Sequence, residues 1–179
     1  MKIIIAFLLI SFGLHSQQMK NYTMDKKYFS CKIPSGWIIE REKDKDIKNK
    51  IYKVTFRNPK DSKSVITIKY YHPLSKKDYK SFVEIQSKTS DGTLESATEK
   101  YEKPKEIKLI NREAVEINRK FKDFESIESK SESYWLKEKI IVIPAKKGFY
   151  SLMLSAKEST FDKNNEIFEK IISSFVPLY

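Results

Sequence analysis

The chain alternates apolar and polar residues in several short runs, which predicts β-strands. Residues 52–56 place Tyr, Val and Phe at every second position, and residues 66–70 repeat this with Ile, Ile and Tyr after a turn signal at residues 58–61. Because successive side chains of a strand point to opposite faces, each run predicts a strand with one buried face. Tyr71 has the opposite parity and is expected to be exposed, where an aromatic ring could bind sugar or peptide.

Two longer runs toward the C-terminus predict central strands. Residues 125–143, near their end, and residues 149–156 carry apolar side chains on both parities, as expected of strands covered on both faces. Pro144–Gly148 has the composition of a hairpin connection between them. Two further strands are predicted over residues 107–109 and 115–121.

Two segments show helical rather than alternating periodicity. In residues 75–86, Ser75 stands three residues before an acid, which predicts a capped helix start. The same spacing places Ser159 at the start of a helix over residues 159–175, which Pro177 ends. This second helix carries a stripe of five apolar residues: Phe161, Phe168, Ile171, Ile172 and Phe175. Burial of each such side chain stabilises by about 1.5–3 kcal/mol, so we expect the helix to dock on the sheet.

The first strand of the predicted domain contains the only cysteine of the chain. Phe29, Cys31 and Ile33 occupy alternate positions and so share one apolar face of the strand. The Cys31 thiol is therefore expected to be buried and inert. A reactive thiol or an intermolecular disulfide is the alternative. One cysteine cannot form an internal disulfide, so the fold depends on its hydrophobic core. Trp37 follows a turn at residues 34–36 and is expected to close the edge of that core, with ligand stacking as the alternative.

The first residues have the pattern of an export signal. Lys2 supplies the positive charge, and residues 3–14 form an apolar stretch that is shorter than the ~20 residues that span a bilayer. We therefore predict a signal peptide over residues 1–16, a flexible lead-in over residues 17–27 and a single domain over residues 28–179. No transmembrane span is expected in the mature chain, which should be exported and soluble in the periplasm or outside the cell.

The net charge of +11 is carried mainly by lysine. Arginine, which reads phosphates and base edges through paired hydrogen bonds, occurs at only four positions: Arg41, Arg57, Arg112 and Arg119. A nucleic-acid partner is therefore not expected. The lysines are spread along the chain among acids, which favours a solvated surface; weak attraction to anionic envelope polymers or lipid headgroups is the alternative.

Catalytic and metal-binding patterns are absent from the sequence. His72 is the one histidine outside the predicted signal peptide, and it has no accompanying cysteine or clustered acids, so a zinc site of the usual kinds is not expected. The sequence contains no Gly-rich phosphate loop and no G-x-S-x-G elbow. We therefore predict no catalytic, cofactor-binding or metal-binding residues and no cofactor. A hydrolase stays open as a hypothesis, and it would need His72 as its base beside acids.

Three features occur in a fixed order along the chain. It enters the predicted domain with FSCKIPSGW at residues 29–37, continues through paired long strands, and ends with a strand that feeds a helix closing on IISSF at residues 171–175. Together these features, which cover residues 28–175, resemble the PsbP-like family of small sandwich domains. The resemblance implies an α+β fold, an α/β/α sandwich whose central, mostly antiparallel sheet is flanked by helices, with the C-terminal helix docked on the sheet.

That resemblance implies no single activity. The family includes photosystem extrinsic subunits, a Ran-binding eukaryotic branch, envelope proteins of the DcrB type and bacterial secretion chaperones. The metal-linked positions of the photosynthetic branch have no matching motif in this sequence, so no metal site is carried over. The export signal argues against a cytoplasmic chaperone or a nuclear transport role.

These observations favour an exported, non-enzymatic binding or assembly factor whose partner is another envelope protein. The alternatives are a salt-sensitive binder of anionic envelope polymer or lipid headgroups, and the hydrolase named above. The polar segment Lys88–Lys105, which Gly92 and Pro104 interrupt, is expected to be a loop with room for a short strand. Because loops often carry specific contacts, this segment is the predicted place of function.

Overall fold

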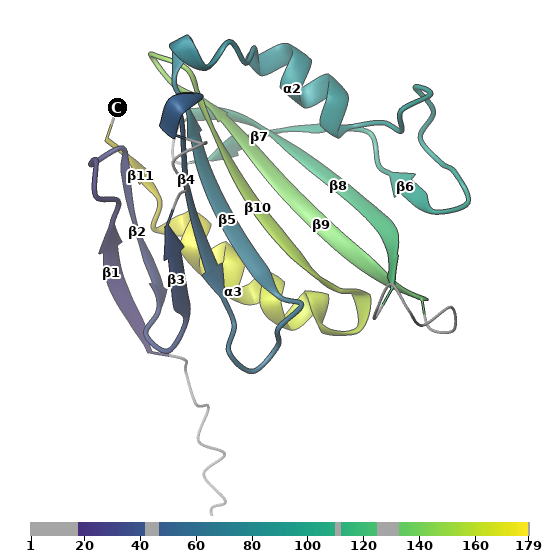
Figure 1. Cartoon of the computed structure of the whole chain (residues 1–179), viewed down its shortest axis with the longest axis horizontal. Coiled ribbons are helices and arrows are strands. Elements are labelled where there is room, and N and C mark those ends of the chain that lie inside the picture. Colours follow the sequence, from purple (N-terminus) through teal and green to yellow (C-terminus); the bar gives the residue numbers. More distant parts are fainter. Residues whose placement is uncertain (1–17, 42–46, 110–111, 125–132, 179) are drawn as a thin grey trace, which may run out of the picture.

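The computed structural model describes residues 18–41, 47–109, 112–124 and 133–178. Within them, the main feature is an antiparallel sheet of eight strands (Figure 1). In spatial order these are β3 (Ile38–Arg41), β4 (Ile51–Arg57), β5 (Val65–Tyr71), β10 (Phe149–Lys157), β9 (Ser133–Pro144), β8 (Arg112–Phe124) and β6 (Glu99–Tyr101), with β7 (Lys105–Leu109) also paired to β8. The predicted signal peptide (residues 1–16) and the expected first part of the run into β9 (residues 125–132) lie outside the described residues.

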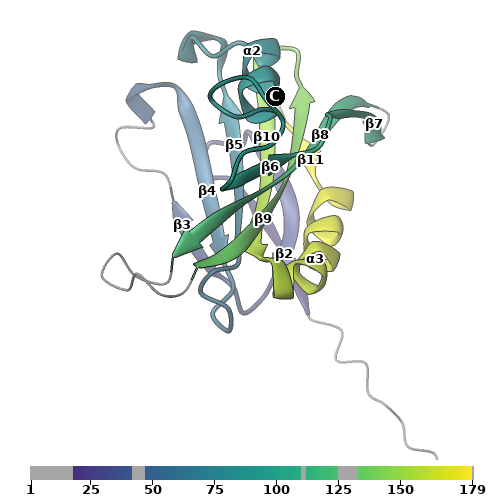
Figure 2. The same ribbon diagram turned by 90° about the vertical axis from the view of Figure 1, so that its right-hand side faces the viewer.

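The two strands that were expected to be covered on both faces lie in the middle of this sheet. Residues 140–143 of β9 and residues 149–152 of β10 are all buried, whichever face they point to. Helices lie on opposite faces: α3 (Phe161–Ser173) on one, and α2 (Tyr79–Gln86) over part of the other (Figure 2). The predicted α+β fold, with a central antiparallel sheet flanked by helices and the C-terminal helix docked on it, is confirmed.

A second, smaller sheet contacts α3. Its strands are β1 (Met19–Thr23), β2 (Phe29–Pro34) and β11 (Val176–Pro177). The flexible lead-in predicted over residues 17–27 is therefore wrong where β1 forms. Backbone pairing to β2 needs no apolar alternation in β1, and the ring of Tyr22 packs edge-on against Phe56 with their centroids 5.2 Å apart.

Helix α3 buries one side against the main core. Its buried residues are Phe161, Asn164, Ile167, Phe168, Ile171 and Ile172. The helix begins at Phe161, after the 3-10 turn η2 (Glu158–Thr160), and not at Ser159 as predicted. The Thr160 hydroxyl donates to Asp61 Oδ2 over 2.9 Å, and no side chain caps the helix. Asn164 donates to the same carboxylate oxygen over 3.3 Å, so the turn between β4 and β5 anchors the start of α3.

Helix α2 covers a smaller apolar cluster on the opposite face. The cluster consists of Tyr71, Ile117, Ile140, Val142 and Phe149. Tyr79, Phe82 and Val83 of α2 pack on it while staying partly exposed, and α2 has no fully buried residue. The second helix is therefore attached to the sheet by half-buried contacts alone.

The predicted start of α2 is displaced by three residues. Ser75 ends the 3-10 turn η1 (Pro73–Ser75), and Lys76 then adopts a left-handed conformation with a φ of 58°. Because this conformation interrupts a right-handed helix, α2 starts only at Tyr79. Asp78 is the cap instead, and its Oδ2 accepts from the Ser81 N–H over 2.8 Å.

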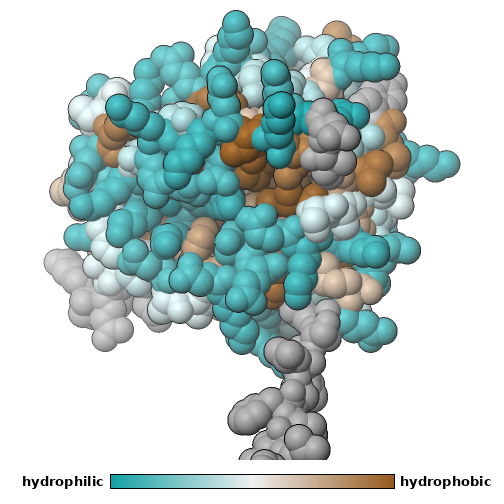
Figure 3. Space-filling view, turned by 180° about the vertical axis from the view of Figure 1, so that it is seen from behind, coloured by the Kyte–Doolittle hydropathy of each residue, from teal (hydrophilic) through white to brown (hydrophobic). Residues whose placement is uncertain are grey.

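The face that carries α3 is mainly hydrophilic, and its largest apolar area lies in its upper part (Figure 3). Val176 and Leu178, near the C-terminus, are both about half exposed. Within the described part of the chain, no helix combines the length and apolarity needed to cross a membrane.

Candidate functional site

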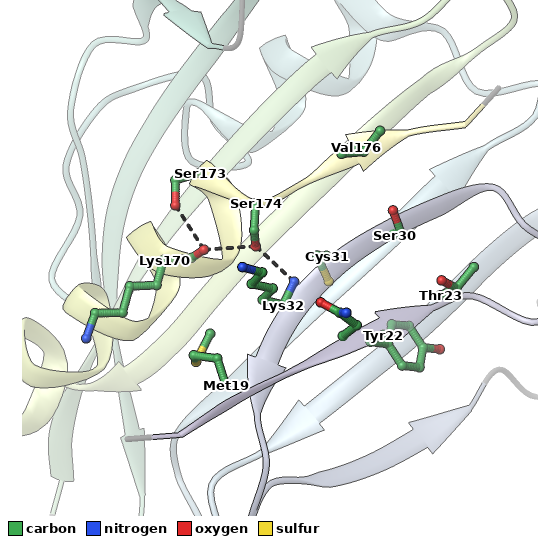
Figure 4. Close-up of a pocket in the computed structure, with 11 residues that line it drawn as sticks. Met19, Tyr22, Thr23, Ser30, Cys31, Lys32, Lys170, Ser173, Ser174 and Val176 are labelled. Atoms are coloured by element: carbon green, nitrogen blue, oxygen red, sulfur yellow. Dashed lines mark hydrogen bonds between the residues drawn. The ribbon is translucent and has the colours of Figure 1, made fainter. Parts of the chain in front are cut away.

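The two core residues singled out in the first strand and turn are both buried, although Cys31 also contributes to the wall of the groove shown in Figure 4. Cys31 is buried, and this burial raises the pKa of its thiol to about 12, so the reactive thiolate is not formed near neutral pH. Trp37 is buried in the main core as well. The predicted burial of Cys31 and of Trp37 is confirmed, and the inertness of the thiol stays a prediction.

His72 lies at the end of β5, where it caps the 3-10 turn η1. Its Nδ1 accepts from the Leu74 N–H over 3.1 Å, and its ring stands edge-on to Tyr70 at 6.3 Å. In the described ranges, no ion pair joins His72 to a carboxylate, and no three His, Cys, Asp or Glu side chains form a group suited to a metal ion. The arrangement expected of a histidine base beside acids is not found around this residue.

Tyr71 is not the exposed aromatic that its parity predicted. It is buried, and its ring stacks on Phe149 with a centroid separation of 4.5 Å and an interplanar angle of 12°. The prediction is wrong because α2 covers this part of the second sheet face and places Phe82 at 5.2 Å from the Tyr71 ring. Tyr71 therefore belongs to the core beneath α2.

A groove of about 800 Å³ lies between the small sheet and the C-terminal end of α3 (Figure 4). Asn21, Thr23, Ser30 and Lys32 of the sheet line it together with Ser173, Lys170 and Ser174 of the helix end. Ser174 accepts from the Lys32 N–H over 2.9 Å and bonds to the Lys170 carbonyl over 3.0 Å, so this hydroxyl joins helix to sheet.

This groove offers hydroxyl, amide and ammonium groups without a base. Neither histidine nor carboxylate lines it, so its serines have no partner to take up a proton. It can hold a polar ligand, and it does not have the arrangement needed to activate a nucleophile.

A second groove, here named the α2 groove, runs between α2 and the segment that follows it. It measures about 390 Å³, and its apolar lining comes from Tyr79, Val83, Leu94, Pro104 and Val115. Val115 belongs to the sheet, Tyr79 and Val83 to the helix, and Leu94 and Pro104 to the predicted functional loop. The α2 groove is thus built from three successive parts of the chain: a helix, the loop that follows it and a strand of the sheet.

The loop wall of the α2 groove is held by a compact turn. Gly92 has a φ of 85°, a left-handed conformation that glycine adopts without strain. The Thr93 N–H donates to Asp91 Oδ1 over 3.1 Å, and the hydroxyls of Thr89 and Thr93 lie 2.9 Å apart. Hydrogen bonds from Thr89, and then from Thr93, lower the pKa of Asp91. The prediction of a loop over Lys88–Lys105 is right for this turn, and the short strand β6 occupies part of the remainder.

Exposed apolar side chains surround α2. Ile85 is 66 % exposed, Leu74 is 68 % exposed and Leu94 is 40 % exposed. The positive charges of Lys76, Lys77 and Lys80 stand on the same helix and the turn before it. One signal of this surface is visible in the sequence, since Ile85 is an apolar residue outside the stripe that begins at Tyr79.

Comparison with known proteins identifies a family over nearly the whole chain. The PsbP family model matches residues 17–176. No curated protein sequence matches. Among solved structures, cyanobacterial PsbP from Synechocystis has 14 % sequence identity and a TM-score of 0.59, with 93 % of this chain and 96 % of that chain covered.

Two other solved structures share the fold. A protein from Bacteroides thetaiotaomicron has 11 % identity and a TM-score of 0.58, covering 89 % of this chain and 48 % of its own. A protein of unknown function from Pseudomonas aeruginosa has 13 % identity and a TM-score of 0.51, with 89 % and 97 % covered. At these identities the similarity shows the fold alone.

Proposed function

This chain belongs to the PsbP family, and from that premise we propose that it is an exported, non-enzymatic binding or assembly factor for an envelope protein. The proposed contact is the surface of α2, with the α2 groove on one side of the helix and, on its other side, a hollow of about 380 Å³ whose lining includes Ile85, Lys76 and Lys77. Family members are generally non-enzymatic, and the surroundings of His72 give the hydrolase hypothesis no support.

The observation that carries this proposal is the apolar surface around α2. A folded protein rarely leaves large apolar side chains clustered around one helix unless that surface binds something. Ile85, Leu74 and Leu94 are such side chains, and the α2 groove beside them has an apolar lining. The lysines at positions 76, 77 and 80 add a positive rim, which fits a partner segment whose apolar residues are flanked by acids.

Site-specific photo-crosslinking in intact cells tests this proposal. A photoreactive residue at Ile85 should give a discrete adduct with one envelope protein, because Ile85 stands at the proposed contact. The matched control is the same residue at Lys163, which is exposed on α3 at the opposite face. Leu94→Asp should reduce the Ile85 adduct at least fivefold, since it places an unpaired charge in the groove.

The salt dependence of binding distinguishes an apolar contact from one driven by charge. Binding through apolar surface should persist at 0.5 M salt, where the Debye length falls to about 4 Å and exposed charges are screened. Equal adducts at both positions, or an Ile85 adduct that Leu94→Asp leaves unchanged, would contradict the proposal.

A further inference from the structure

Three lysines from three strands lie in one row across the large sheet. Lys100 of β6 is opposite Lys120 of β8, and Lys120 is opposite Lys137 of β9. Neighbouring strands are about 4.8 Å apart, so the row is about 10 Å long. Like charges directly opposite each other destabilise a sheet, so the stability of this sheet does not account for the row.

The row is extended by a fourth lysine and supported by aromatic rings. Lys122 follows Lys120 on the same face of β8, and Trp135 is its cross-strand partner. The ammonium groups of Lys120 and Lys122 lie 5.1 and 5.4 Å from the centre of the Trp135 ring. Such contacts hold cations in place without neutralising them. We name Lys100, Lys120, Lys122 and Lys137 the lysine row.

Acidic partners neutralise only part of the lysine row. Glu158 lies 3.0 Å from the Lys120 ammonium, and Glu95 pairs with Lys100. Among the described residues, no ion pair involves Lys122 or Lys137. Within the part of the chain that the structure describes, Lys122 and Lys137 therefore carry charges that no carboxylate pairs with.

The next row of the same face is different, because its lysine is fully paired. Lys139 lies 3.1 Å from Glu116 and 2.7 Å from Glu169. Although burial disfavours its charge, hydrogen bonds to Glu169 and Glu116 raise the pKa of Lys139. Neutralisation by two neighbouring acids is thus available on this face, whereas Lys100 and Lys120 of the lysine row have one acidic partner each.

Three lysines of the row, Lys100, Lys120 and Lys137, line a groove of about 410 Å³ together with Phe161 and Asn165 from the start of α3. The groove is also lined by four carboxylates, and each is paired with a basic side chain: Glu102 with Lys105, Glu116 with Lys139, Glu138 with Arg119 and Glu158 with Lys120. The side-chain oxygen of Asn165 is buried there and has no hydrogen-bond partner. An amide presents either an oxygen or an NH₂ group at such a position, so Asn165 can donate to a bound anion.

These features favour one class of partner. Charges spread over about 10 Å match a line of anions better than a single ion, and a planar lipid surface reaches only the rim of a recess. The side chains suited to recognising nucleic-acid bases are already engaged in other contacts. Arg119 Nε lies 2.6 Å from Glu138, and the ammonium groups of Lys120 and Lys122 lie over the Trp135 ring. We propose that the lysine row binds a linear envelope polymer that carries a phosphate or carboxylate in each repeat unit.

The test compares two charge-matched double variants of the full-length protein. Lys120→Gln with Lys137→Gln removes two charges from the lysine row. Lys108→Gln with Lys146→Gln removes two exposed lysines elsewhere. The probes are long-chain polyphosphate, alginate, single-stranded DNA, and vesicles of phosphatidylcholine with 30 % phosphatidylglycerol, each titrated from low to moderate salt.

We expect the lysine-row variant to bind polyphosphate or alginate at least tenfold more weakly at low salt, and the control to change less than twofold. The slope of log affinity against log salt should become shallower by about 1.4, at about 0.7 for each lysine lost. The lysine-row variant should melt close to the temperature of the parent, since removal of the like-charge pair offsets the loss of the partly exposed Lys120–Glu158 ion pair and of the Lys120–Trp135 contact. Loss of folding would then not explain weaker binding.

Three results would overturn this assignment. Equal weakening by both double variants would show that net charge alone drives binding. Tighter binding of the vesicles than of either polymer, at equal anion concentration, would assign the lysine row to lipid. Tighter binding of single-stranded DNA than of polyphosphate would assign it to nucleic acid.

Discussion

Two helices pack on opposite faces of the same sheet, and they are attached very differently. Helix α3 buries six residues and is anchored at its start by Asp61 from a distant turn. Helix α2 buries none, and hollows of about 390 and 380 Å³ flank it on its two sides. Both helices are amphipathic, so periodicity alone does not separate them.

The difference indicates that the two helices have different roles. Helix α3 completes the core and leaves little apolar surface of its own, so it stabilises the domain. Helix α2 keeps apolar side chains in contact with solvent, which lowers its contribution to stability and leaves it free to contact a partner. The following predictions separate the two roles, from the largest expected effect to the smallest.

Removal of the Phe168 ring should have the largest effect on stability. Phe168→Ala opens a cavity in the main core at the centre of α3, and such losses of a buried aromatic cost about 3–5 kcal/mol. Urea unfolding followed by circular dichroism measures the free energy of unfolding. A loss below about 2 kcal/mol would show that α3 is less essential than its burial indicates.

Loss of the hydrogen bonds between Asp61 and the start of α3 should have an intermediate effect on stability. Asp61→Ala removes one acceptor of Thr160 and one of the buried Asn164, which keeps its bond to the Thr160 carbonyl, so we expect a loss of about 1 kcal/mol, at the low end for a buried donor that loses a partner. The same urea unfolding experiment measures it. Asp162→Ala, an exposed acid in the first turn of α3, is the matched control and should change stability less.

The equivalent change in α2 should affect the helix more than the domain. Phe82 is only partly buried, so we expect Phe82→Ala to cost about 1 kcal/mol globally, below the cost of Phe168→Ala. Hydrogen exchange should show faster opening of α2 amides with α3 amides unchanged. Equal acceleration in both helices would contradict the idea that α2 opens independently.

The smallest effect should come from titration of the α2 cap. The Ser81 N–H, as the main cause, holds the pKa of Asp78 below its usual value of 3.8. Because the folded pKa is the lower one, the cap stabilises α2 above the unfolded pKa and this stabilisation is lost as pH falls through the folded pKa. The Ser81 amide shift, followed by NMR, should titrate below pH 3.8, and Asp78→Asn should abolish that titration.

Most strands and the C-terminal helix could be predicted because their patterns are local. Alternation over residues 52–56 and 66–70, and apolar residues on both parities of β9 and β10, are properties of short segments. The small sheet could not be predicted in the same way. Its strand β11, near the C-terminus, pairs with β2 near the start of the domain, and β1 is mostly polar. Neither β1 nor β11 therefore shows an alternation of apolar and polar residues that predicts a strand.

The candidate surfaces also differ in how far the sequence could predict them. The loop over Lys88–Lys105 was expected to carry function, and it does form one wall of the α2 groove. The exposed position predicted for Tyr71 was wrong because parity does not reveal which face a distant helix covers. The lysine row was not visible in the sequence, where Lys100, Lys120 and Lys137 are separated by many residues and mixed with acids.

The sequence by itself determined which segments are strands and helices and which of their faces are apolar, because these properties depend on neighbouring residues. Only the tertiary structure decided how tightly each helix docks and which charges meet. Strand register brings Lys100, Lys120 and Lys137 into one row, and the packing of α2 decides whether Tyr71 or Ile85 is exposed. Register and packing depend on contacts between distant segments, which no local pattern specifies.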